Sequence, residues 1–159
     1  MTLTDLLNRS CVAADLKVSS KKQLIQEMAE LIVDCGCLEN TDIKVREIVS
    51  AAMERERLGS TGVGSGVALP HARIDGLSQV RAVFARLETP VDFESIDERP
   101  VDLAVLILAP TEAGGDHLRA LAMISRKLRN EDNRARFRKA PDAESLFVAF
   151  TEEARATAA

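Results

Sequence analysis

The sequence predicts an α/β fold, in which one layered domain holds a central mixed β-sheet flanked by helices. Apolar runs typical of strands lie in the middle of the chain, and segments with apolar residues at helical spacing lie before and after them. The chain has 159 residues, 46% of them apolar and 29% charged, which is usual for one globular domain. We therefore expect a single domain over residues 1–159, with a core from about residue 5 to residue 153.

Two helices are expected in the first third of the chain. Ser20 followed by Gln23 resembles a capping box, and the apolar spacing after it predicts a helix near residues 20–34. Thr41 can cap a second helix, which should end before Gly59 because several glycines follow. The apolar residues on the expected buried faces are Leu24, Ile25, Met28, Leu31 and Ile32 in the first helix, and Ile43, Ile48, Val49, Ala52 and Met53 in the second.

Three strands are expected in the middle of the chain. A short strand covers residues 66–69 and leads into Pro70, and two longer ones lie near residues 80–87 and 101–109. The last of these is a nearly unbroken apolar run, which is typical of a strand buried on both faces. Pro90 and Pro100 mark the loop between the two longer strands.

The last third of the chain is expected to be helical. Asp116 can cap a third helix, because apolar residues recur along one side of the segment that follows it. A short helix near residues 131–138 and a last one near residues 142–154 complete the chain. We expect the tail, residues 156–159, to be frayed.

Charge and hydropathy narrow the possible classes of function. Acidic residues number 25 and basic residues 21, and the resulting net charge of -4 argues against a strongly basic nucleic-acid binder. No stretch approaches the length of about 18 consecutive apolar residues, so no membrane insertion is expected. The first residues lack a cationic segment followed by an apolar one, so we expect no signal peptide and a cytoplasmic location.

The three cysteines do not suggest a disulfide framework. Cys11, Cys35 and Cys37 are odd in number, and no export signal precedes them. Cys35 and Cys37 lack the C-x-x-C spacing of redox and zinc pairs, and the histidines are not at ligand spacing. We therefore expect neither a metal nor another cofactor.

The segment between residues 59 and 70 holds four glycines and can be compared with known phosphate-binding loops. Gly59 and Gly64 have the spacing of a P-loop, but the lysine that would reach the nucleotide phosphates is missing after them. The G-x-G-x-G run that begins at Gly62 resembles a dinucleotide fingerprint, but Leu69 stands where the third glycine belongs and no helix opens there. Both nucleotide-binding interpretations therefore fail.

What remains in this segment is a flexible loop, a short strand and His71, which directly follows Pro70. The proline fixes its own φ and favours extended geometry in the residue before it, which would hold the histidine in one direction. A neutral imidazole with a clear face and nearby donors can accept a phosphoryl group. The alternative is an ordinary structural histidine that is partly buried and hydrogen-bonded.

Two further residues could supply donors for a phosphoryl group. His117 is the only other histidine and is expected in the first turn of a helix, where backbone amides favour an anion. Arg55 lies just before the glycines, and its guanidinium matches phosphate geometry. The alternatives are an exposed first-turn histidine and a solvated charge at a helix end.

These residues resemble the type-2 EIIA domains of the bacterial phosphoenolpyruvate-dependent phosphotransferase system, the mannitol and fructose type. The most specific match is residues 55–71, which read R-E-R-L-G-S-T-G-V-G-S-G-V-A-L-P-H and end on the Pro-His step of the family. Segments 87–93 and 100–103, and the helix beginning at His117, also resemble family segments, so the resemblance covers nearly the whole chain. Within the family, the chain is most similar to the nitrogen-regulatory branch.

The resemblance implies a role for each of the three residues. His71 would be the phosphoryl acceptor, His117 the second active-site histidine that supports the phosphorylated imidazole, and Arg55 the arginine that contacts the phosphoryl group. It also implies a phosphotransferase component with a phosphohistidine intermediate. The donor would be an HPr-like carrier protein of the NPr type, and no metal or nucleotide is implied at the site.

Two roles on this scaffold stay open. A regulator of the nitrogen branch would bind downstream proteins according to its phosphorylation state, whereas a sugar-specific component would pass the phosphoryl group to a IIB domain. We favour the regulator, because the chain ends after the IIA domain and contains no membrane segment. A further alternative is a regulator whose histidine no longer accepts a phosphoryl group.

A function from another class is a partner-binding or nucleic-acid-binding module. Residues 119–139 contain eight basic and two acidic residues, with the densest part between Arg134 and Lys139. A solvated helical face explains such a cluster more simply, and we do not expect a nucleic-acid partner. Steep weakening of duplex binding with rising salt would indicate otherwise.

Overall fold

The computed structural model describes residues 1–38, 41–112 and 114–152. Its helices are α1 (Leu3–Leu6), the 3-10 helix η1 (Arg9–Cys11), α2 (Lys21–Asp34), α3 (Val45–Arg57), α4 (Gly115–Arg129), α5 (Glu131–Lys139) and α6 (Ala143–Thr151). Its strands are β1 (Val12–Leu16), β2 (Gly62–Gly64), β3 (Val67–Ala68), β4 (His71–Ile74), β5 (Arg81–Val91) and β6 (Val101–Pro110).

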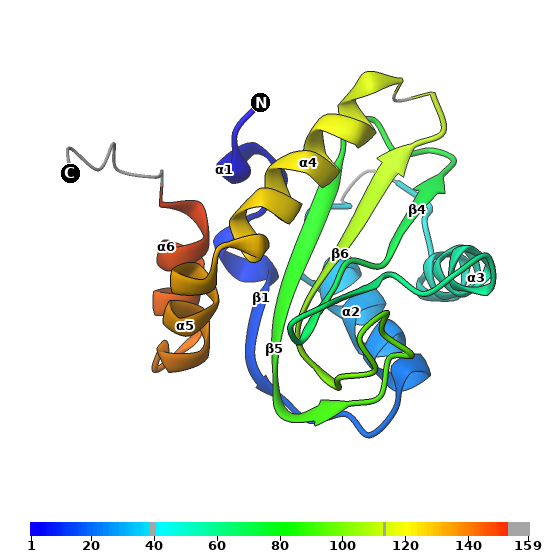
Figure 1. The fold of residues 1–159 in the computed structure, drawn as a ribbon. Helices are drawn as coiled ribbons and strands as arrows, with labels where there is room; N and C mark the ends of the chain where they lie inside the picture. The colour runs from blue at the N-terminus through cyan, green and yellow to red at the C-terminus, as the bar shows by residue number, and fades with distance from the viewer. Residues whose placement is uncertain (39–40, 113, 153–159) are drawn as a thin grey trace.

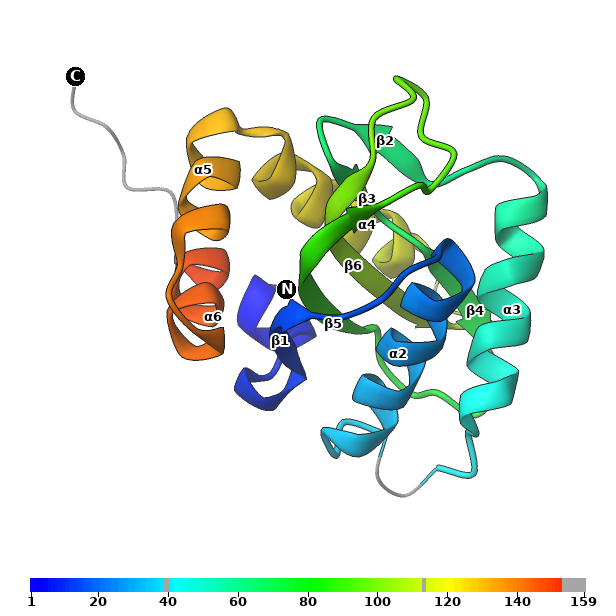
Figure 2. The same cartoon turned by 90° about the horizontal axis from the view of Figure 1, so that it is seen from below.

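The strands form one mixed sheet in the order β1-β5-β6-β3-β2, with β4 also paired to β6 (Figure 1). β6 is antiparallel to β5 and parallel to β3 and β4, while β1 is parallel to β5. Figure 2 shows α2 over one face of the sheet, with α3 beside it, and α4 behind the other face. α6 packs against β1, and α5 packs against α6. The predicted α/β domain with a central mixed sheet is confirmed.

The long apolar strand of the sequence is β6, and helices cover both of its faces. Every residue from Leu103 to Ala109 is buried, as the unbroken apolar run predicts. Beside it, Phe84 of β5 packs against Phe137 of α5 and Phe150 of α6, with ring centroids 5.4 and 4.7 Å away. These rings pack the two C-terminal helices against the sheet.

The expected strand that leads into Pro70 continues beyond it, which corrects the sequence analysis. Val67 of β3 pairs with Leu103 of β6. His71 of β4 pairs with Ile107 at the same offset, so β3 and β4 form one line along β6 with a break at the proline. Pro70 has no N–H to donate, but its carbonyl accepts a hydrogen bond from Ile107 N at 3.0 Å. His71 therefore opens a strand that the sequence did not predict.

The capping box predicted for the first helix is present in a shifted form. Ser20 Oγ accepts a hydrogen bond from Gln23 N at 3.1 Å, as a capping residue does. The Gln23 side chain, however, accepts a hydrogen bond from Ser19 N at 2.7 Å rather than from Ser20 N. The helix start is therefore confirmed, with the reciprocal contact one residue earlier.

Two other predicted helix caps are wrong. α3 begins after Lys44, and Thr41 instead donates its hydroxyl to a backbone carbonyl three residues earlier, because the helix starts too far along for this hydroxyl to reach its amides. α4 begins after Gly114, whose φ of 56° suits a residue without a Cβ. Asp116 lies inside the first turn of α4 and accepts a hydrogen bond from Arg119.

One strand ends later than the sequence predicts. β5 extends to Val91 and so contains Pro90, which we expected in a loop. The pairing of β5 with β6 is irregular between Arg86 and Val91. Pro90 lies in this stretch, so its lack of an N–H removes no regular hydrogen bond between the strands. The last helix ends at Thr151, while the predicted end at residue 154 and the predicted frayed tail lie outside the described residues.

All three cysteines meet at one place, which we call the cysteine cluster (Cys11, Cys35 and Cys37). Cys11 and Cys35 form a disulfide with their Cα atoms 5.4 Å apart, and Cys37 Sγ lies 3.3 Å from Cys35 Sγ. The expectation of no disulfide is wrong, because the number and spacing of cysteines do not show which segments meet. Here η1 lies against the C-terminal end of α2, where Ser10 Oγ also donates to Cys35 O at 3.1 Å.

The helices of the described residues are shorter than a membrane-spanning helix. The longest among the described residues, α4, has 15 residues, whereas a membrane span needs about 20. Within the described part of the chain, none of the helices combines the length and the apolar character that a membrane span requires.

Candidate active site

His71 lies at the first position of β4, half-buried, with its ring held by the backbone. Its Nδ1 lies 2.8 Å from Leu69 O, on the far side of Pro70. Because a carbonyl oxygen can only accept, a neutral imidazole in this contact carries its proton on Nδ1. Nε2 is then left with its lone pair, which is the state that a nucleophilic histidine needs.

His117 lies beside His71, as the sequence analysis expected. It is in the first turn of α4, is only 6% exposed, and its ring centroid is 5.5 Å from that of His71 in an edge-to-face arrangement. Burial, and then the charges of His71 and Arg73, lower the pKa of His117 below its usual 6.5. His117 Nε2 has no hydrogen-bond partner among the described residues, so it is available to an incoming group.

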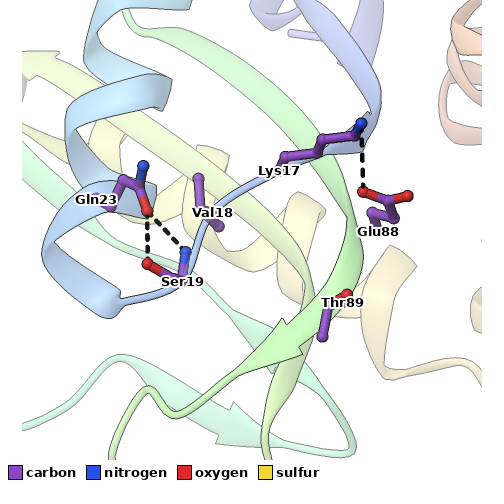
Figure 3. A pocket seen from close by; sticks show the side chains of 6 residues that line it. All are labelled: Lys17, Val18, Ser19, Gln23, Glu88 and Thr89. Carbon is purple, nitrogen blue, oxygen red and sulfur yellow. Dashed lines mark hydrogen bonds and ion pairs between the residues drawn. The ribbon is translucent and has the colours of Figure 1, made fainter.

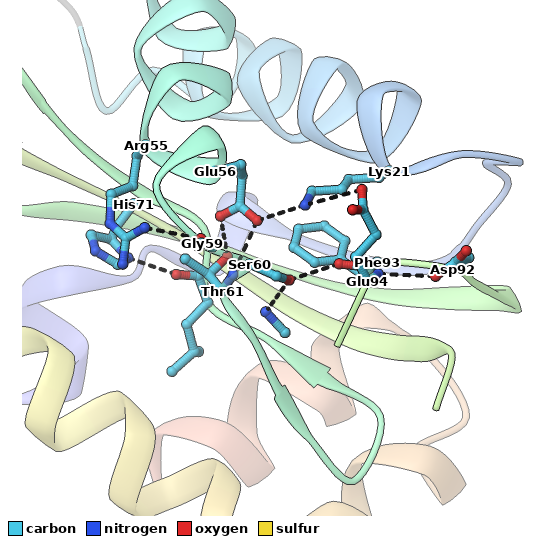
Figure 4. Close-up of polar contacts among 12 residues, drawn as sticks. Lys21, Arg55, Glu56, Gly59, Ser60, Thr61, His71, Asp92, Phe93 and Glu94 are labelled. Atoms are coloured by element: carbon cyan, nitrogen blue, oxygen red, sulfur yellow. Dashed lines mark hydrogen bonds and ion pairs between the residues drawn. The ribbon is translucent and has the colours of Figure 1, made fainter. Parts of the chain in front are cut away.

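Arg55 lies in the last turn of α3 and reaches the same place. Its Nη1 donates to Gly59 O at 3.0 Å, which holds the guanidinium at the start of the glycine segment. Figure 4 shows the Arg55 side chain next to the ring of His71. The three residues singled out by the sequence thus line one pocket of about 620 Å³, which we call the histidine pocket. The residues that line it are Ala51, Glu54, Arg55, Leu58, His71, Ala72, Arg73, His117, Leu118 and Leu121.

Arg73 is a site residue that the sequence analysis missed. It lines the histidine pocket, donates to Thr111 O at 3.2 Å, and contributes to the lowered pKa of His117. The missed signal is the strand that begins at His71, because side chains two residues apart on a strand lie on the same face. Arg73 adds a second cation beside the two histidines.

The rim of the histidine pocket carries exposed apolar side chains. Leu58, at the C-terminal end of α3, is 84% exposed, and Leu118, in the first turn of α4, is 68% exposed. Both line the pocket, so leucines stand beside the cationic and imidazole groups. Apolar side chains in such a position favour contact with another protein surface over a free small anion.

The glycine segment forms a hairpin instead of a phosphate loop. β2 and β3 are antiparallel, and Ser65 and Gly66 between them have φ values of 58° and 80°, the signature of a tight two-residue turn. A Cβ on Gly66 would lie 2.5 Å from Arg138 Nη2 and 2.7 Å from Asp102 Oδ1. The positive φ favours glycine here, whereas the two close atoms are the ends of side chains that can move aside.

The described residues offer one group that could hold a metal ion. In residues 1–38, 41–112 and 114–152, the cysteine cluster is the one set of three potential ligands within 4.8 Å of one another. It lies at the end of α2 and none of its residues lines the histidine pocket. The histidine pocket itself is lined by the imidazoles of His71 and His117 and the guanidiniums of Arg55 and Arg73.

A second pocket, of about 300 Å³, lies where β1 leads into α2 (Figure 3). Its polar side chains are largely engaged with one another. Ser19 Oγ donates to Gln23 Oε1 at 3.0 Å, and Lys17 Nζ lies 4.0 Å from Glu88 Oε2. This pocket brings together no nucleophile with a base, so it does not compete with the histidine pocket as a reaction site.

The basic segment 119–139 lies on α4 and α5, and several of its charges are used within the chain. Arg138 pairs with Asp102 at 2.9 Å, and Arg136 forms an ion pair with Glu152. Arg134 donates to the backbone carbonyls at the end of α4. These contacts support the interpretation of the segment as a structural helical surface.

Comparison with known proteins identifies the family. Residues 5–153 match the family model described as phosphoenolpyruvate-dependent sugar phosphotransferase system, EIIA 2. The chain belongs to this EIIA 2 family. It is accordingly a phosphotransferase component that works through a phosphohistidine intermediate, as the resemblance implied. Proteins of the EIIA 2 family interact with phosphocarrier proteins and with IIB partners.

Individual relatives place the chain within the EIIA 2 family. A nitrogen regulatory protein of Bradyrhizobium diazoefficiens is 44% identical over 147 residues, which cover 92% of this chain and 93% of the relative. The crystal structure of nitrogen regulatory protein IIA-Ntr from Neisseria meningitidis superposes with a TM-score of 0.85 at 32% identity, covering 94% of this chain and 99% of that one.

A more distant structure shares the fold. Enzyme IIAMTL of Escherichia coli, solved in complex with phosphorylated enzyme IIBMTL, superposes with a TM-score of 0.74 at 20% identity. The match covers 91% of this chain and 98% of that one. At this identity the likeness concerns the fold alone.

Proposed function

We propose that His71 accepts a phosphoryl group on Nε2 from an HPr-like carrier protein and that the chain acts as a phosphorylation-dependent regulator of the nitrogen branch. The observation that carries this proposal is the contact between His71 Nδ1 and Leu69 O at 2.8 Å, beside His117 and Arg55 in one pocket. This contact leaves Nε2 unprotonated and fixes the direction in which it faces.

The proposed transfer of a phosphoryl group from the carrier to His71 exchanges one N–P bond for another. The Nε2 lone pair of His71 attacks the phosphorus of the carrier's phosphohistidine, and a new N–P bond forms. The N–P bond to the carrier breaks, and its electron pair stays on the carrier's ring nitrogen. Since such transfers depend mainly on positioning and charge stabilisation, the fixed ring of His71 and the nearby donors supply what the reaction needs.

His117, Arg55 and Arg73 have complementary tasks around the phosphoryl oxygens. The lowered pKa keeps His117 neutral near pH 7, so that it can donate one N–H without a second full charge beside His71. Arg55 and Arg73, which line the same pocket, carry the positive charge that a phosphoryl group requires. We assign His117 to support of the phosphorylated imidazole and Arg55 to direct contact with the phosphoryl group.

The donor is proposed to be a protein of the NPr type. Exposed Leu58 and Leu118 beside the histidine pocket favour an apolar protein surface as the partner. The 44% identity to a nitrogen regulatory protein favours the regulatory branch, in which the phosphorylation state changes binding to downstream proteins. We propose that the phosphoryl transfer and the regulation take place in the cytoplasm.

The second candidate is a sugar-specific component that passes the phosphoryl group to a IIB domain. The family model that matches residues 5–153 favours it, because its description names a sugar phosphotransferase system. Both candidates share the first step and differ in the acceptor.

One experiment tests the proposal and separates the candidates. The chain is incubated with phosphoenolpyruvate, the first enzyme of the system and an NPr-type carrier, and its intact mass is measured. We expect one acid-labile phosphoryl group on the wild type and none on His71→Ala. Labelling of His71→Ala at the wild-type stoichiometry would refute the assignment, and rapid transfer from the labelled chain to a IIB domain would favour the sugar-specific role.

A further inference from the structure

A buried ion pair lies directly behind the turn that joins α3 to β2. Glu56, in the last turn of α3, has a side chain only 2% exposed, and Lys21, the first residue of α2, has one 14% exposed. Lys21 Nζ lies 3.0 Å from Glu56 Oε1 and 4.7 Å from the centroid of the Phe93 ring. A cation at a helix N-terminus is unfavourable by itself, and here it is offset by the carboxylate of Glu56 and by that of Glu94, whose Oε1 lies 3.8 Å from Lys21 Nζ.

The carboxylate of Glu56 holds one residue of the turn by two bonds. Thr61 N donates to Glu56 Oε1 at 3.0 Å, and Thr61 Oγ1 donates to Glu56 Oε2 (Figure 4). Together with Lys21, both carboxylate oxygens are thus engaged, as a buried charge requires. Thr61 itself is 5% exposed, so water does not compete for these bonds.

From Thr61 the hydrogen bonds lead to the acceptor histidine. Leu69 N donates to Thr61 O at 3.0 Å, which fixes the Leu69 peptide. Leu69 O in turn lies 2.8 Å from His71 Nδ1. The same turn presents Gly59 O to Arg55, so its position also sets the place of the guanidinium. The carboxylate of Glu56 is therefore connected to the His71 ring through Thr61 and Leu69, without lining the pocket itself.

We propose that Glu56, with Lys21 as its counter-ion, is a positioning residue that sets the tautomer and the direction of His71 through Thr61 and Leu69. This inference rests on the proposed function of His71. It predicts that loss of the Glu56–Thr61 bonds releases Leu69, and with it the fixed Nδ1–H state of the ring. Part of the imidazole then carries its proton on Nε2, where it cannot attack phosphorus.

The test combines nitrogen NMR of the histidine rings with transfer kinetics on the full chain. In Glu56→Ala we expect a mixture of His71 tautomers, while the wild type shows Nδ1–H alone. The maximal transfer rate should fall roughly tenfold to hundredfold, as displacements of about 1 Å do, with a much smaller change in the KM for the carrier. Glu56→Gln can still accept from Thr61 N and donate to Thr61 Oγ1, so it should keep the wild-type tautomer.

Two further variants keep the proposal testable if Glu56→Ala does not fold. Thr61→Val keeps the shape of the side chain but removes the hydroxyl, and Thr61→Ser restores the hydroxyl. We expect the valine variant to shift the tautomer and slow transfer, and the serine variant to behave like the wild type. Ile32→Val, a buried change in α2 outside this network, serves as the control for lowered stability.

The outcomes separate this proposal from the proposed function. Wild-type tautomer and rate in Glu56→Ala and Thr61→Val would overturn the positioning role, and so would an equal loss in Ile32→Val. The tautomer is read without any phosphoryl donor. If the wild type accepts no phosphoryl group but the tautomer responds to Glu56→Ala, the proposed function fails while the structural connection stands.

Discussion

The histidine pocket and the cysteine cluster both bring together nucleophilic side chains from distant parts of the chain, but only one is arranged for group transfer. In the pocket, His71 is half-buried, its Nδ1 is tied to a carbonyl, and two arginines stand beside it. In the cluster, two of the three sulfurs are already bonded to each other, and the third is half-buried. Proximity of nucleophiles is thus not sufficient, since a reactive site also needs a free lone pair, access and donors for the incoming charge.

The sharpest way to test this contrast is to remove the nucleophile of each region in turn. If His71 is the acceptor, as proposed, His71→Ala should abolish acid-labile phosphorylation. The free energy of unfolding should change by no more than about 1 kcal/mol, because the side chain is only half-buried. Replacement of all three cysteines by serine should leave the labelling stoichiometry unchanged. Intact mass and urea unfolding measure both effects, and loss of labelling in the cysteine variant would contradict the separation.

Reduction of the Cys11–Cys35 disulfide should act on stability and spare the reaction. The bond joins residues 24 positions apart, and opening a loop of this size lowers stability by roughly 3 kcal/mol through the entropy of the unfolded chain. Urea unfolding with and without a reductant measures the loss, and thiol titration should rise from one free thiol to three. Unchanged stability after complete reduction would show that the cluster does not constrain the fold.

His117→Ala should slow transfer without preventing it. Loss of one preorganised donor typically costs about a hundredfold in rate, and some labelling of His71 should remain. Rapid-quench measurement of the phosphorylation rate checks this. A matched change at the other region, Cys37→Ser, should leave the rate as it is, and an unaltered rate in His117→Ala would return this histidine to a structural role.

The two regions should also respond at opposite ends of the pH range. The pKa of His117 is lower in the native chain than in the unfolded chain. Below about pH 6.5 the unfolded chain therefore binds a proton more readily, and the free energy of unfolding should fall as the pH drops. Burial raises the pKa of the Cys37 thiol above 9.0. The stability that the buried, neutral thiol contributes should therefore be lost as the pH rises beyond that value. Urea unfolding midpoints across pH for the wild type, His117→Asn and Cys37→Ser measure both dependences. An acid-side loss of stability that persists in His117→Asn, or an alkaline-side loss that persists in Cys37→Ser, would contradict the assignment.

The sequence anticipated much of the fold because the strongest patterns are local. The capped helix that became α2 and the apolar run that became β6 each contain their own signal, in helical spacing or in length without polar interruption. β1, β2 and β4 were missed, because strands of three to five residues acquire their identity from the strand beside them. The predicted caps at Thr41 and Asp116 were wrong, although both residue types favour helix N-caps, because the helices begin after Lys44 and Gly114.

The amino-acid sequence by itself determined the class of the fold and the family, and it singled out His71, His117 and Arg55 as candidates, since these depend on residue types at fixed spacing. Only the tertiary structure decided that Arg73 lines the same pocket, that Glu56 is connected to the His71 ring through Thr61 and Leu69, and that Cys11 meets Cys35. Each of these contacts joins backbone segments whose relative position is set by strand register and helix packing. No local pattern in the chain encodes that register, so the contacts become visible only when the sheet is assembled.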